Sequence, residues 1–580
     1  MTSIAPSAAA TVPHRAAVET RQEIELAEGV TIHLLVAGPV PRALAYGMDF
    51  VLRIGIYYML AIFLGMASMA VGEAATGIMI LGIFLLEWFY NVVFEQSRWG
   101  ATPGQRMLGL RVVSETGAAP SPMQSVLRNL LRAADFLPVG YALGAAVALG
   151  TKRFQRLGDL AAGTLVVHQG KADGEAQRRP LAPRSVPQPP PPAEAPLVPL
   201  TPEESRAVLQ FEARLTTWTT PRQQEIAGHA VGAIGRTNDP ARQVRAIARW
   251  LQDPGAATAA AAAPEARWQQ LDEWLTRLEH PRKKKGVPPP PWAALPSLFR
   301  QACADLALAR QRCLSPVLIE RINDLCLRTC QHLYGGRTEL RSTLGRFFFV
   351  DFPQAVRAEW RLVAWCHFFF WFPFFCLLIW GDRDPRWFEA VLGPAGMQSL
   401  HEMYDNASTI SSGRDSLGEN FAMFGFYIWN NVGIAFRTFA GGILAGVGAL
   451  FITAYNGVAI GASAGYITRA ADPVAFWTFV SGHAAFELTG IVLSAAAGVR
   501  LGLALVAPGA QSRSRALAGA ARRAFPILSG AALLIVGAAF IEGFWSPLAM
   551  PPLLKYSVGL LLWVMLGAYF VFSGRRPRSA

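Results

Sequence analysis

The sequence lacks the motifs by which many enzymes are recognised. It contains neither a phosphate-binding loop of the G-x-x-x-x-G-K-[ST] type nor the H-E-x-x-H pattern of a zinc protease. We therefore expect no enzymatic activity, no catalytic residue and no cofactor.

Cysteine is scarce and confined to one part of the chain. All six cysteines lie between Cys303 and Cys376, and no two form the C-x-x-C pair that is typical of zinc and thiol-redox sites. Four of them fall in a segment that we place in the cytoplasm, where thiols stay reduced. We expect buried, reduced thiols and no metal ion. A metal site at Cys326 and Cys330, which share a helix face near His332, is the less favoured alternative.

Charge is also sparse, since only 16% of the residues are charged whereas 52% are hydrophobic. Residues 1–40 lack the apolar core of a cleavable signal peptide, so the first apolar segment is expected to act as its own insertion signal. The formal net charge of +13 could indicate nucleic acid. In a membrane protein, however, basic residues set the topology and contact anionic lipid headgroups. We expect the lipid bilayer and its headgroups as partners, and no nucleic acid.

The apolar residues are concentrated in blocks that are long enough to cross about 30 Å of hydrocarbon as helices. These blocks are residues 43–70, 75–94, 362–380, 421–467, 476–506, 525–544 and 553–572. The fourth block has the length of two spans. The predicted fold is an all-α polytopic membrane protein with about eight transmembrane helices, small cytoplasmic β elements and a cytoplasmic helical segment.

Composition divides the chain into six regions. They are a disordered N-terminus (1–21), a first membrane module (22–169), a proline-rich linker (170–200), a mostly helical region (201–358), a second membrane module (359–573) and a basic tail (574–580). The arginine distribution places both termini and residues 170–358 in the cytoplasm of a bacterial inner membrane. Residues 133–150 are short for a span and are expected to be interfacial or re-entrant. Residues 23–37, 107–113 and 163–168 have β-like patterns and are expected to form a small sheet.

Polar side chains interrupt both spans of the first module. Arg42, Asp49 and Arg53 fall on one helical face, and we expect Asp49 to pair with one of the two arginines because a lone intramembrane carboxylate is costly. The second span carries a polar stripe of Glu87, Asn91 and Glu95. Two stripes in adjacent helices predict one shared network.

The first module resembles the RDD family of membrane proteins. The matching residues are Arg42, Asp49 and Asp159, the last within R-L-G-D-L-A-A-G-T, together with the run G-A-T-P-G-Q-R-M-L-G-L-R-V-V at residues 100–113. The resemblance covers residues 22–169. It implies transport of unidentified ligands, which for some members is sodium/proton exchange. The alternative is a buried ion-pair network that only fixes helix packing.

The second module combines small residues with polar ones. Small residues recur every four positions, which favours close helix packing. They are Gly457, Gly461 and Gly465, and then Gly490, Ser494, Gly498 and Gly502. A candidate polar cluster consists of Asn430, Asn431, Asn456, His483, Glu487 and Glu542. We expect His483 and Glu487 to lie on a face that meets the helix of Asn456. They form either a structural pair or a proton or cation site.

The second module and the residues before it resemble the stage II sporulation protein M family. The matching runs are L-P-S-L-F-R from Leu295, D-F-P-Q-A-V-R from Asp351, N-N at Asn430, N-G-V-A-I-G-A from Asn456, G-H-A-A-F-E-L from Gly482 and E-G-F-W-S-P from Glu542. The resemblance covers residues 267–572. It implies a non-enzymatic assembly role, because the namesake acts with partners in a complex that remodels peptidoglycan.

Two functions follow from these observations. The first is a scaffold or assembly factor of a cell-envelope complex, which would recruit other envelope proteins through residues 170–358. The second is a transporter or ion-coupled permease, exchanging cations or protons through the intramembrane charged residues.

Overall fold

The computed structural model describes residues 21–25, 31–97, 99–168, 194, 196–198, 200, 202–215, 218–235, 237–252, 258–279, 294–311, 316–333, 344–381, 383–384, 386–405, 417–470 and 472–575. The expected disordered N-terminus, most of the proline-rich linker and the end of the basic tail lie outside these residues. The chain forms two compact units. Residues 1–38 with 167–333 are called the helical unit, and residues 39–166 with 334–580 are called the membrane unit.

The helical unit begins with an antiparallel hairpin. Strand β1 (Arg21–Glu25) pairs with β2 (Thr31–Leu35), with Ile24 opposite Ile32. Val36 then forms a single bridge with Val167. The hairpin confirms the β pattern of residues 23–37.

Two groups of helices make up the rest of the helical unit. The first group comprises α8 (Pro202–Arg214), α9 (Thr220–Gly228), α10 (Val231–Ile234) and α11 (Pro240–Gln252). Apolar residues three apart on α11, Val244 and Ile247, pack with Phe211 of α8 in one core. The second group comprises α12 (Thr258–Glu279), α13 (Leu295–Gln311) and α14 (Pro316–Leu333).

The cysteines of the second group are buried thiols. Cys303 of α13 donates to Cys326 of α14 across an Sγ–Sγ distance of 3.9 Å. This hydrogen bond and burial both raise the pKa of Cys326. Among the described cysteines, Cys303, Cys326, Cys330 and Cys366 are buried, as expected, and Cys376 is half-buried.

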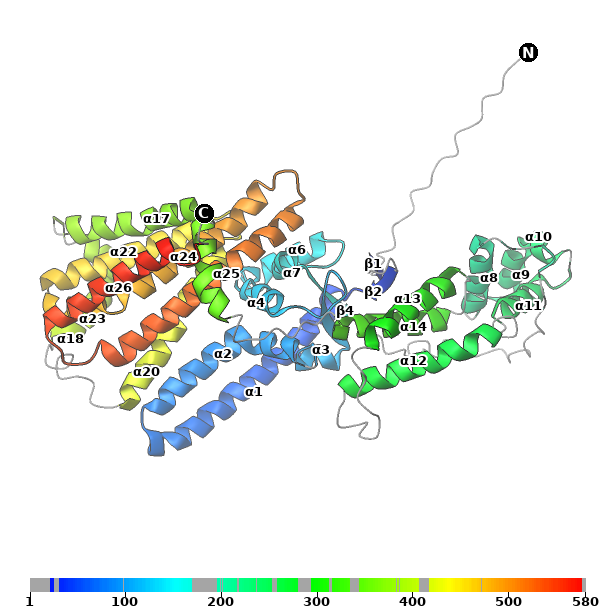
Figure 1. The fold of residues 1–580 in the computed structure, drawn as a ribbon, viewed down its shortest axis with the longest axis horizontal. Helices are drawn as coiled ribbons and strands as arrows, with labels where there is room; N and C mark the ends of the chain where they lie inside the picture. The colour runs from blue at the N-terminus through cyan, green and yellow to red at the C-terminus, as the bar shows by residue number, and fades with distance from the viewer. Residues whose placement is uncertain are drawn as a thin grey trace, which may run out of the picture. The chain divides into compact units, whose positions relative to one another are not determined.

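The membrane unit starts with a helical pair followed by short elements. Helices α1 (Pro39–Val71) and α2 (Ala74–Gln96) lie side by side (Figure 1). The short elements are α3 (Pro103–Met107), β3 (Leu110–Ser114), α4 (Pro122–Leu130), α5 (Arg132–Asp135), α6 (Ala142–Gly150), α7 (Leu157–Ala162) and β4 (Thr164–His168). Strands β3 and β4 form a sheet of their own, so the β elements make two small sheets instead of the single one expected. Helix α6 has nine residues, a length of about 14 Å that cannot cross a bilayer.

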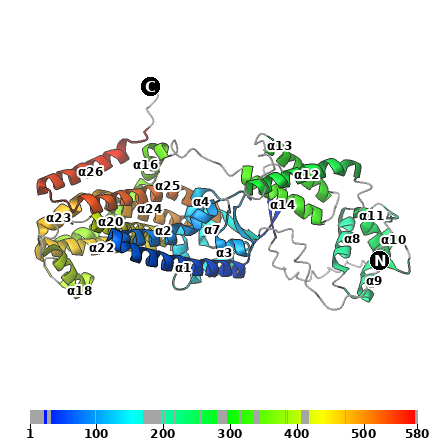
Figure 2. The ribbon, with the colours of Figure 1, turned by 90° about the horizontal axis from the view of Figure 1, so that it is seen from below.

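Longer helices follow from residue 344. They are η3 (Phe347–Asp351, π-helical), α16 (Phe352–Ala358), α17 (Trp360–Trp380), α18 (Arg386–Asp405), α20 (Leu417–Tyr427), η4 (Ile428–Val432, π-helical), α21 (Gly433–Gly441), α22 (Val447–Ala470), α23 (Pro473–Ser481), α24 (Ala484–Val506), α25 (Arg513–Phe540), η5 (Ile541–Trp545, π-helical) and α26 (Pro552–Phe572). Figure 2 shows α22, α24, α25 and α26 running roughly parallel or antiparallel to one another.

Among the described residues, seven helices are long and apolar enough to cross a membrane. An eighth segment of membrane length runs through α20, η4 and α21, whose 11, 5 and 9 residues follow each other directly. Its length is about 37 Å at 1.5 Å per residue. The expected all-α polytopic membrane fold is confirmed, and the block at residues 421–467 contains two helical segments as predicted.

The two membrane modules pack against each other and share one core. Helix α2 lies along α20, α7 packs on α25, and α5 packs on α21. Phe84 and Trp88 of α2 surround Phe436 of α21, with ring centroids 6.3 and 5.0 Å away. A Cβ atom added at Gly425 would lie 2.7 Å from the carbonyl oxygen of Gly77, so these helices approach at backbone distance. The modules therefore form a single body.

The regularly spaced small residues confirm the expected close packing. A Cβ atom added at Gly457 or Gly461 would collide with a backbone carbonyl of α17, and one added at Gly465 would lie 2.9 Å from the Phe388 ring of α18. Gly490 faces α25 in the same way, because an added Cβ would lie 2.5 Å from Cγ1 of Ile535.

Candidate functional site

A buried ion network lies where α1, α2, α4 and α7 of the membrane unit meet. At its centre, Asp159 of α7 accepts hydrogen bonds from Nε and Nη2 of Arg128, at 3.1 and 2.9 Å, and from Arg42 of α1. Arg156 caps the same helix, and its backbone N–H donates to Asp159 Oδ2 at 3.3 Å. Arg128 and Asp159 are 1% and 0% exposed, so water does not screen these pairs.

Arg128 also joins this network to the polar stripe of α2. Its Nη1 contacts Glu95, whose other oxygen accepts a hydrogen bond from Ser125 at 2.7 Å. Asn129 donates to both Glu95 oxygens at 3.3 Å, and Asn91 donates to Asn129 at 3.0 Å. The network therefore links three of the expected site residues of α1 and α2 to Asp159: Arg42, Asn91 and Glu95.

Asp135 of α5 lies at the edge of this network. Its carboxylate is fully buried and stands 3.7 Å from Arg156 Nη1. Burial raises the pKa of Asp135 to about 6, against the opposing effect of the Arg156 guanidinium. Burial would also raise the pKa of Asp159, but the charges of Arg42, Arg128 and Arg156 outweigh it and hold that pKa below its ordinary value.

Asp49 belongs to a different set of contacts, and its expected pairing with an arginine is wrong. Oδ1 of Asp49 accepts hydrogen bonds from the Tyr90 hydroxyl at 3.0 Å and from the Gly104 N–H at 2.8 Å. Oδ2 accepts from the Thr102 hydroxyl at 2.5 Å. The carboxylate is satisfied by a tyrosine and by the first turn of α3, where hydrogen bonds and the helix N-terminus replace a cation.

Arg53 instead faces Glu87 of α2. Arg53 Nη1 lies 3.5 Å from Glu87 Oε2, and Arg132 Nη2 lies 3.8 Å from Glu87 Oε1. Arg53 and Arg132 are buried, whereas the Glu87 side chain is 54% exposed. The polar residues of the first module thus divide into three groups of contacts, and the single shared network that we expected is only partly correct.

Sequence reasoning missed the residues that α4 and α5 contribute to these groups. Arg128, Asn129, Arg132 and Asp135 all lie on the short helices α4 and α5, which pack on α2 and α21. The detectable signal was two arginines four residues apart, which share a helical face, in a segment flanked by apolar residues.

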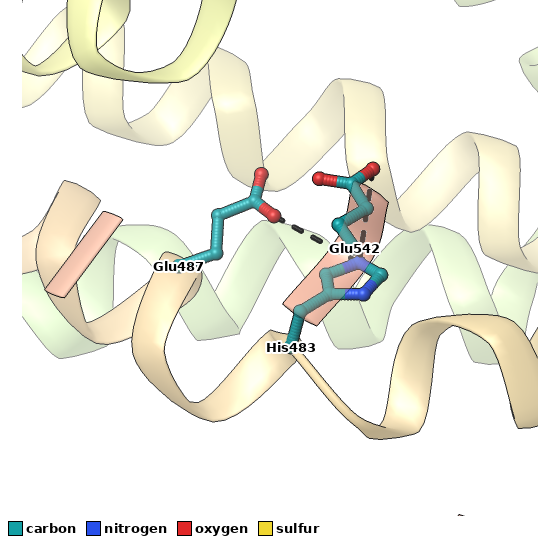
Figure 3. Close-up of side chains that lie close together, drawn as sticks. All are labelled: His483, Glu487 and Glu542. Carbon is teal, nitrogen blue, oxygen red and sulfur yellow. Dashed lines mark ion pairs between the residues drawn. The ribbon is translucent and has the colours of Figure 1, made fainter. Parts of the chain in front are cut away.

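The second module brings three ionisable side chains together at the junction between α23 and α24 (Figure 3). Helix α23 ends at Ser481 and α24 begins at Ala484, so His483 stands at the break and Glu487 lies in the first turn of α24. Glu542 comes from the π-helical segment η5. His483 Nε2 lies 3.9 Å from Glu487 Oε2 and 4.0 Å from Glu542 Oε1. One ligand atom from each residue lies within 4.8 Å of the others.

Neighbouring groups hold this cluster in place. His483 Nδ1 lies 3.2 Å from the Ser546 hydroxyl, and Lys555 Nζ donates to the Ser546 carbonyl oxygen at 2.7 Å. His483, Ser546 and Lys555 are at most 5% exposed. The arrangement can hold a proton or a cation between the imidazole and the carboxylates.

The three candidate asparagines are occupied elsewhere. Asn430 donates to its neighbour Asn431 at 2.7 Å in η4, and Asn456 donates to the Ile452 carbonyl oxygen of its own helix at 2.7 Å. The Gly490 face of α24 meets α25. Helix α24 also packs on α22, the helix of Asn456, as predicted. The predicted cluster of His483 and Glu487 with Asn456 is wrong, and Glu542 takes the place of Asn456 because η5 follows α25.

Comparison with known families matches three stretches of the chain. Residues 36–163 match the RDD family, and residues 366–547 match stage II sporulation protein M. Residues 259–335 match a domain of unknown function (DUF8413). No curated protein and no solved structure matches the chain significantly. Both expected resemblances are confirmed over shorter stretches than 22–169 and 267–572, and the run from Leu295 falls within the third match.

Proposed function

We propose that this chain, in which an RDD-family segment is joined to a stage II sporulation protein M segment, is a non-enzymatic scaffold of a bacterial cell-envelope complex. The observation that carries the proposal is the buried network around Asp159. Its three arginines, Arg42, Arg128 and Arg156, balance three carboxylates, Glu95, Asp135 and Asp159.

A balanced and buried network fixes the arrangement of the helices that carry it. Removing any one partner would leave a charge unpaired in a dry site, so alternative arrangements of these helices are costly. An ion pathway would instead need charges that water or a substrate can reach. The network therefore favours a rigid arrangement of helices, as in a scaffold, over the changing arrangement that a transporter needs.

The helical unit supports the recruiting part of the proposal. Its helices form bundles with their own apolar cores, and some large apolar side chains remain on the surface. Trp250 of α11 and Leu308 of α13 are both 42% exposed. Trp250, on α11, is a large aromatic side chain of the type enriched in protein interfaces, and it therefore gives the position at which the proposal is tested.

The proposal includes a membrane topology in which residues 170–358 and both termini of the chain lie in the cytoplasm. The membrane unit is a multi-pass body whose surface carries apolar side chains such as Tyr58, Phe372 and Leu561, as a bilayer requires. Arg513 and Arg515 lie in the first turn of α25, directly after the connection between α24 and α25, and the positive-inside rule favours a cytoplasmic place for that end of the helix. Labelling of a cysteine placed near Pro190 tests this orientation, and labelling from outside the cell would contradict it.

Site-specific photocrosslinking in native membranes tests the scaffold. A photoreactive residue at Trp250, or at Arg242 on the same helix, should give adducts with one defined protein. The same residue at Leu561 on α26, which is 55% exposed, serves as the control and should give no such adduct. The experiment is done in the organism that makes the chain. The proposal would be contradicted if adducts formed only at Leu561, or at none of the three positions.

One observation favours a second function, that of an ion-coupled permease. His483 and Glu487 lie at a break between two helices, and Glu542 lies in a π-helical segment. Interrupted helices that carry ionisable groups are a recurring feature of secondary transporters, although here the groups lie at the ends of the candidate spans Ala484–Val506 and Arg513–Trp545. Gradient-driven flux through the purified chain in liposomes would favour this function over the scaffold.

A further inference from the structure

We propose that His483, Glu487 and Glu542 bind one divalent first-row transition-metal ion, such as Zn²⁺ or Mn²⁺, inside the second membrane module. The site is assembled from the break between α23 and α24 and from η5 (Figure 3). Its ligand atoms are His483 Nε2 and one carboxylate oxygen from each glutamate. This site goes beyond the scaffold function and does not depend on it.

The distances fit a metal centre better than a set of hydrogen bonds. At 3.9 and 4.0 Å, the imidazole nitrogen is too far from the two carboxylates to hydrogen-bond with either. A tetrahedral ion at about 2.1 Å from each ligand would separate the ligand atoms by about 3.4 Å. Small rotations of the two glutamate side chains, by roughly 1 Å at the oxygens, would complete such a site.

The groups behind the imidazole orient it as a metal ligand. With Nδ1 protonated and donating to the Ser546 hydroxyl at 3.2 Å, the lone pair of Nε2 points between the two carboxylates. A hydrogen bond from the second ring nitrogen is the usual support of a metal-bound histidine. Ser546 is itself fully buried, and the Lys555 ammonium is held on its carbonyl oxygen. Ser546 is therefore a positioning residue.

Burial gives the ion a physical role. Two carboxylates whose oxygens lie within 4.8 Å of each other repel strongly in an apolar environment. A divalent cation would neutralise both, whereas a single proton would neutralise one. The imidazole favours a transition metal over Mg²⁺ or Ca²⁺, which prefer ligand sets made only of oxygen. Three protein ligands would also leave one coordination position open.

Metal content of the full-length chain tests the proposal. The chain is purified in detergent with a tag that contains no histidine, loaded with Zn²⁺ or Mn²⁺, desalted, and analysed by elemental mass spectrometry. We expect about one ion per wild-type chain and less than a tenth of that in the isosteric variants Glu487→Gln and Glu542→Gln. Ser546→Ala should bind the metal about 10–100-fold more weakly.

A matched variant and a second readout keep the test decisive. Glu359→Gln removes a carboxylate of similar burial, which pairs with Arg500 at 3.1 Å, and should retain the ion. Because Cys303 and Cys326 could also take up Zn²⁺, only the uptake lost in the glutamate variants counts as binding at this site. Added Zn²⁺ or Mn²⁺ should raise the melting temperature of the wild type but not of Glu487→Gln. If the wild type and Glu487→Gln had the same metal content and the same metal-induced shift in melting temperature, the proposal would be overturned.

Discussion

Replacing Arg128 should destabilise the membrane unit more than replacing any exposed arginine. The guanidinium of Arg128 is 1% exposed and connects Asp159 of α7 with Glu95 of α2. Arg128→Met would keep the aliphatic part of the side chain and leave both carboxylates with fewer partners. Breaking a buried ion pair by removal of one partner costs about 3–5 kcal/mol.

Thermal unfolding of the full chain in detergent measures this cost as a relative melting temperature. We expect Arg128→Met to melt at least about 5 °C below the wild type. Arg153→Met is the matched control, because Arg153 is 43% exposed and lies 3.6 Å from a half-exposed Glu115. Exposed pairs contribute about 0–1 kcal/mol, so the control should melt within about 2 °C of the wild type.

A double variant tests whether the loss comes from the unpaired carboxylate. Arg128→Met combined with Glu95→Gln should recover part of the stability, because it removes the charge that was left unpaired. The pKa of Asp159 is held below its ordinary value, so its contribution is fully present above that ordinary pKa and stays constant between pH 5 and 8. Equal melting temperatures for Arg128→Met and Arg153→Met would refute the reasoning.

Three further variants test other parts of the account. Because burial raises the pKa of Asp135 from 3.8 to about 6, the stability it contributes is fully present below its ordinary pKa and is lost as the pH rises through the folded pKa, by about 3 kcal/mol in total and by about half of that above pH 5. The wild type should melt at a lower temperature at pH 8 than at pH 5, and this difference should be smaller in Asp135→Asn. An equal difference in the two proteins would mean that other groups cause it. Gly104→Ala should lower the melting temperature and the expression level, because the added methyl group would collide with the Ala45 carbonyl oxygen and the Asp49 carboxylate. Wild-type values for this variant would contradict the close packing of α3 on α1. Gly457→Val should separate α22 from α17 and reduce the yield of folded protein in size-exclusion chromatography, whereas Gly55→Val, on an open surface of α1, should elute as the wild type does.

The membrane helices were predictable because one physical requirement dominates their sequences. A segment that must cross hydrocarbon needs about 20 apolar residues, and few other constraints produce such runs. The blocks at residues 43–70 and 75–94 accordingly became α1 and α2. Close packing at Gly457 was predictable for a similar reason, since regular small residues in an apolar helix have few other uses.

Side-chain partners were predicted less well because they depend on tertiary contacts. Asp49 could have been neutralised by Arg42 or Arg53 on its own helix, yet it binds Tyr90 and the start of α3. The short helices α4 and α5 supply Arg128 and Arg132, whose four-residue spacing indicates a shared helical face but does not show that this face is buried. Likewise, Glu542 lies more than fifty residues beyond His483 in the chain, and only the packing of η5 brings the two together.

Transport by the purified full-length chain is the most direct test of the claim that it is a scaffold and not a permease. The chain is reconstituted into liposomes that contain a pH-sensitive dye, and gradients of Na⁺, K⁺ and protons are applied, with protein-free liposomes and the Glu487→Gln variant as controls. The scaffold account predicts proton and cation movement no faster than in the protein-free liposomes. Gradient-driven flux that is present in the wild type and lost in Glu487→Gln would contradict it.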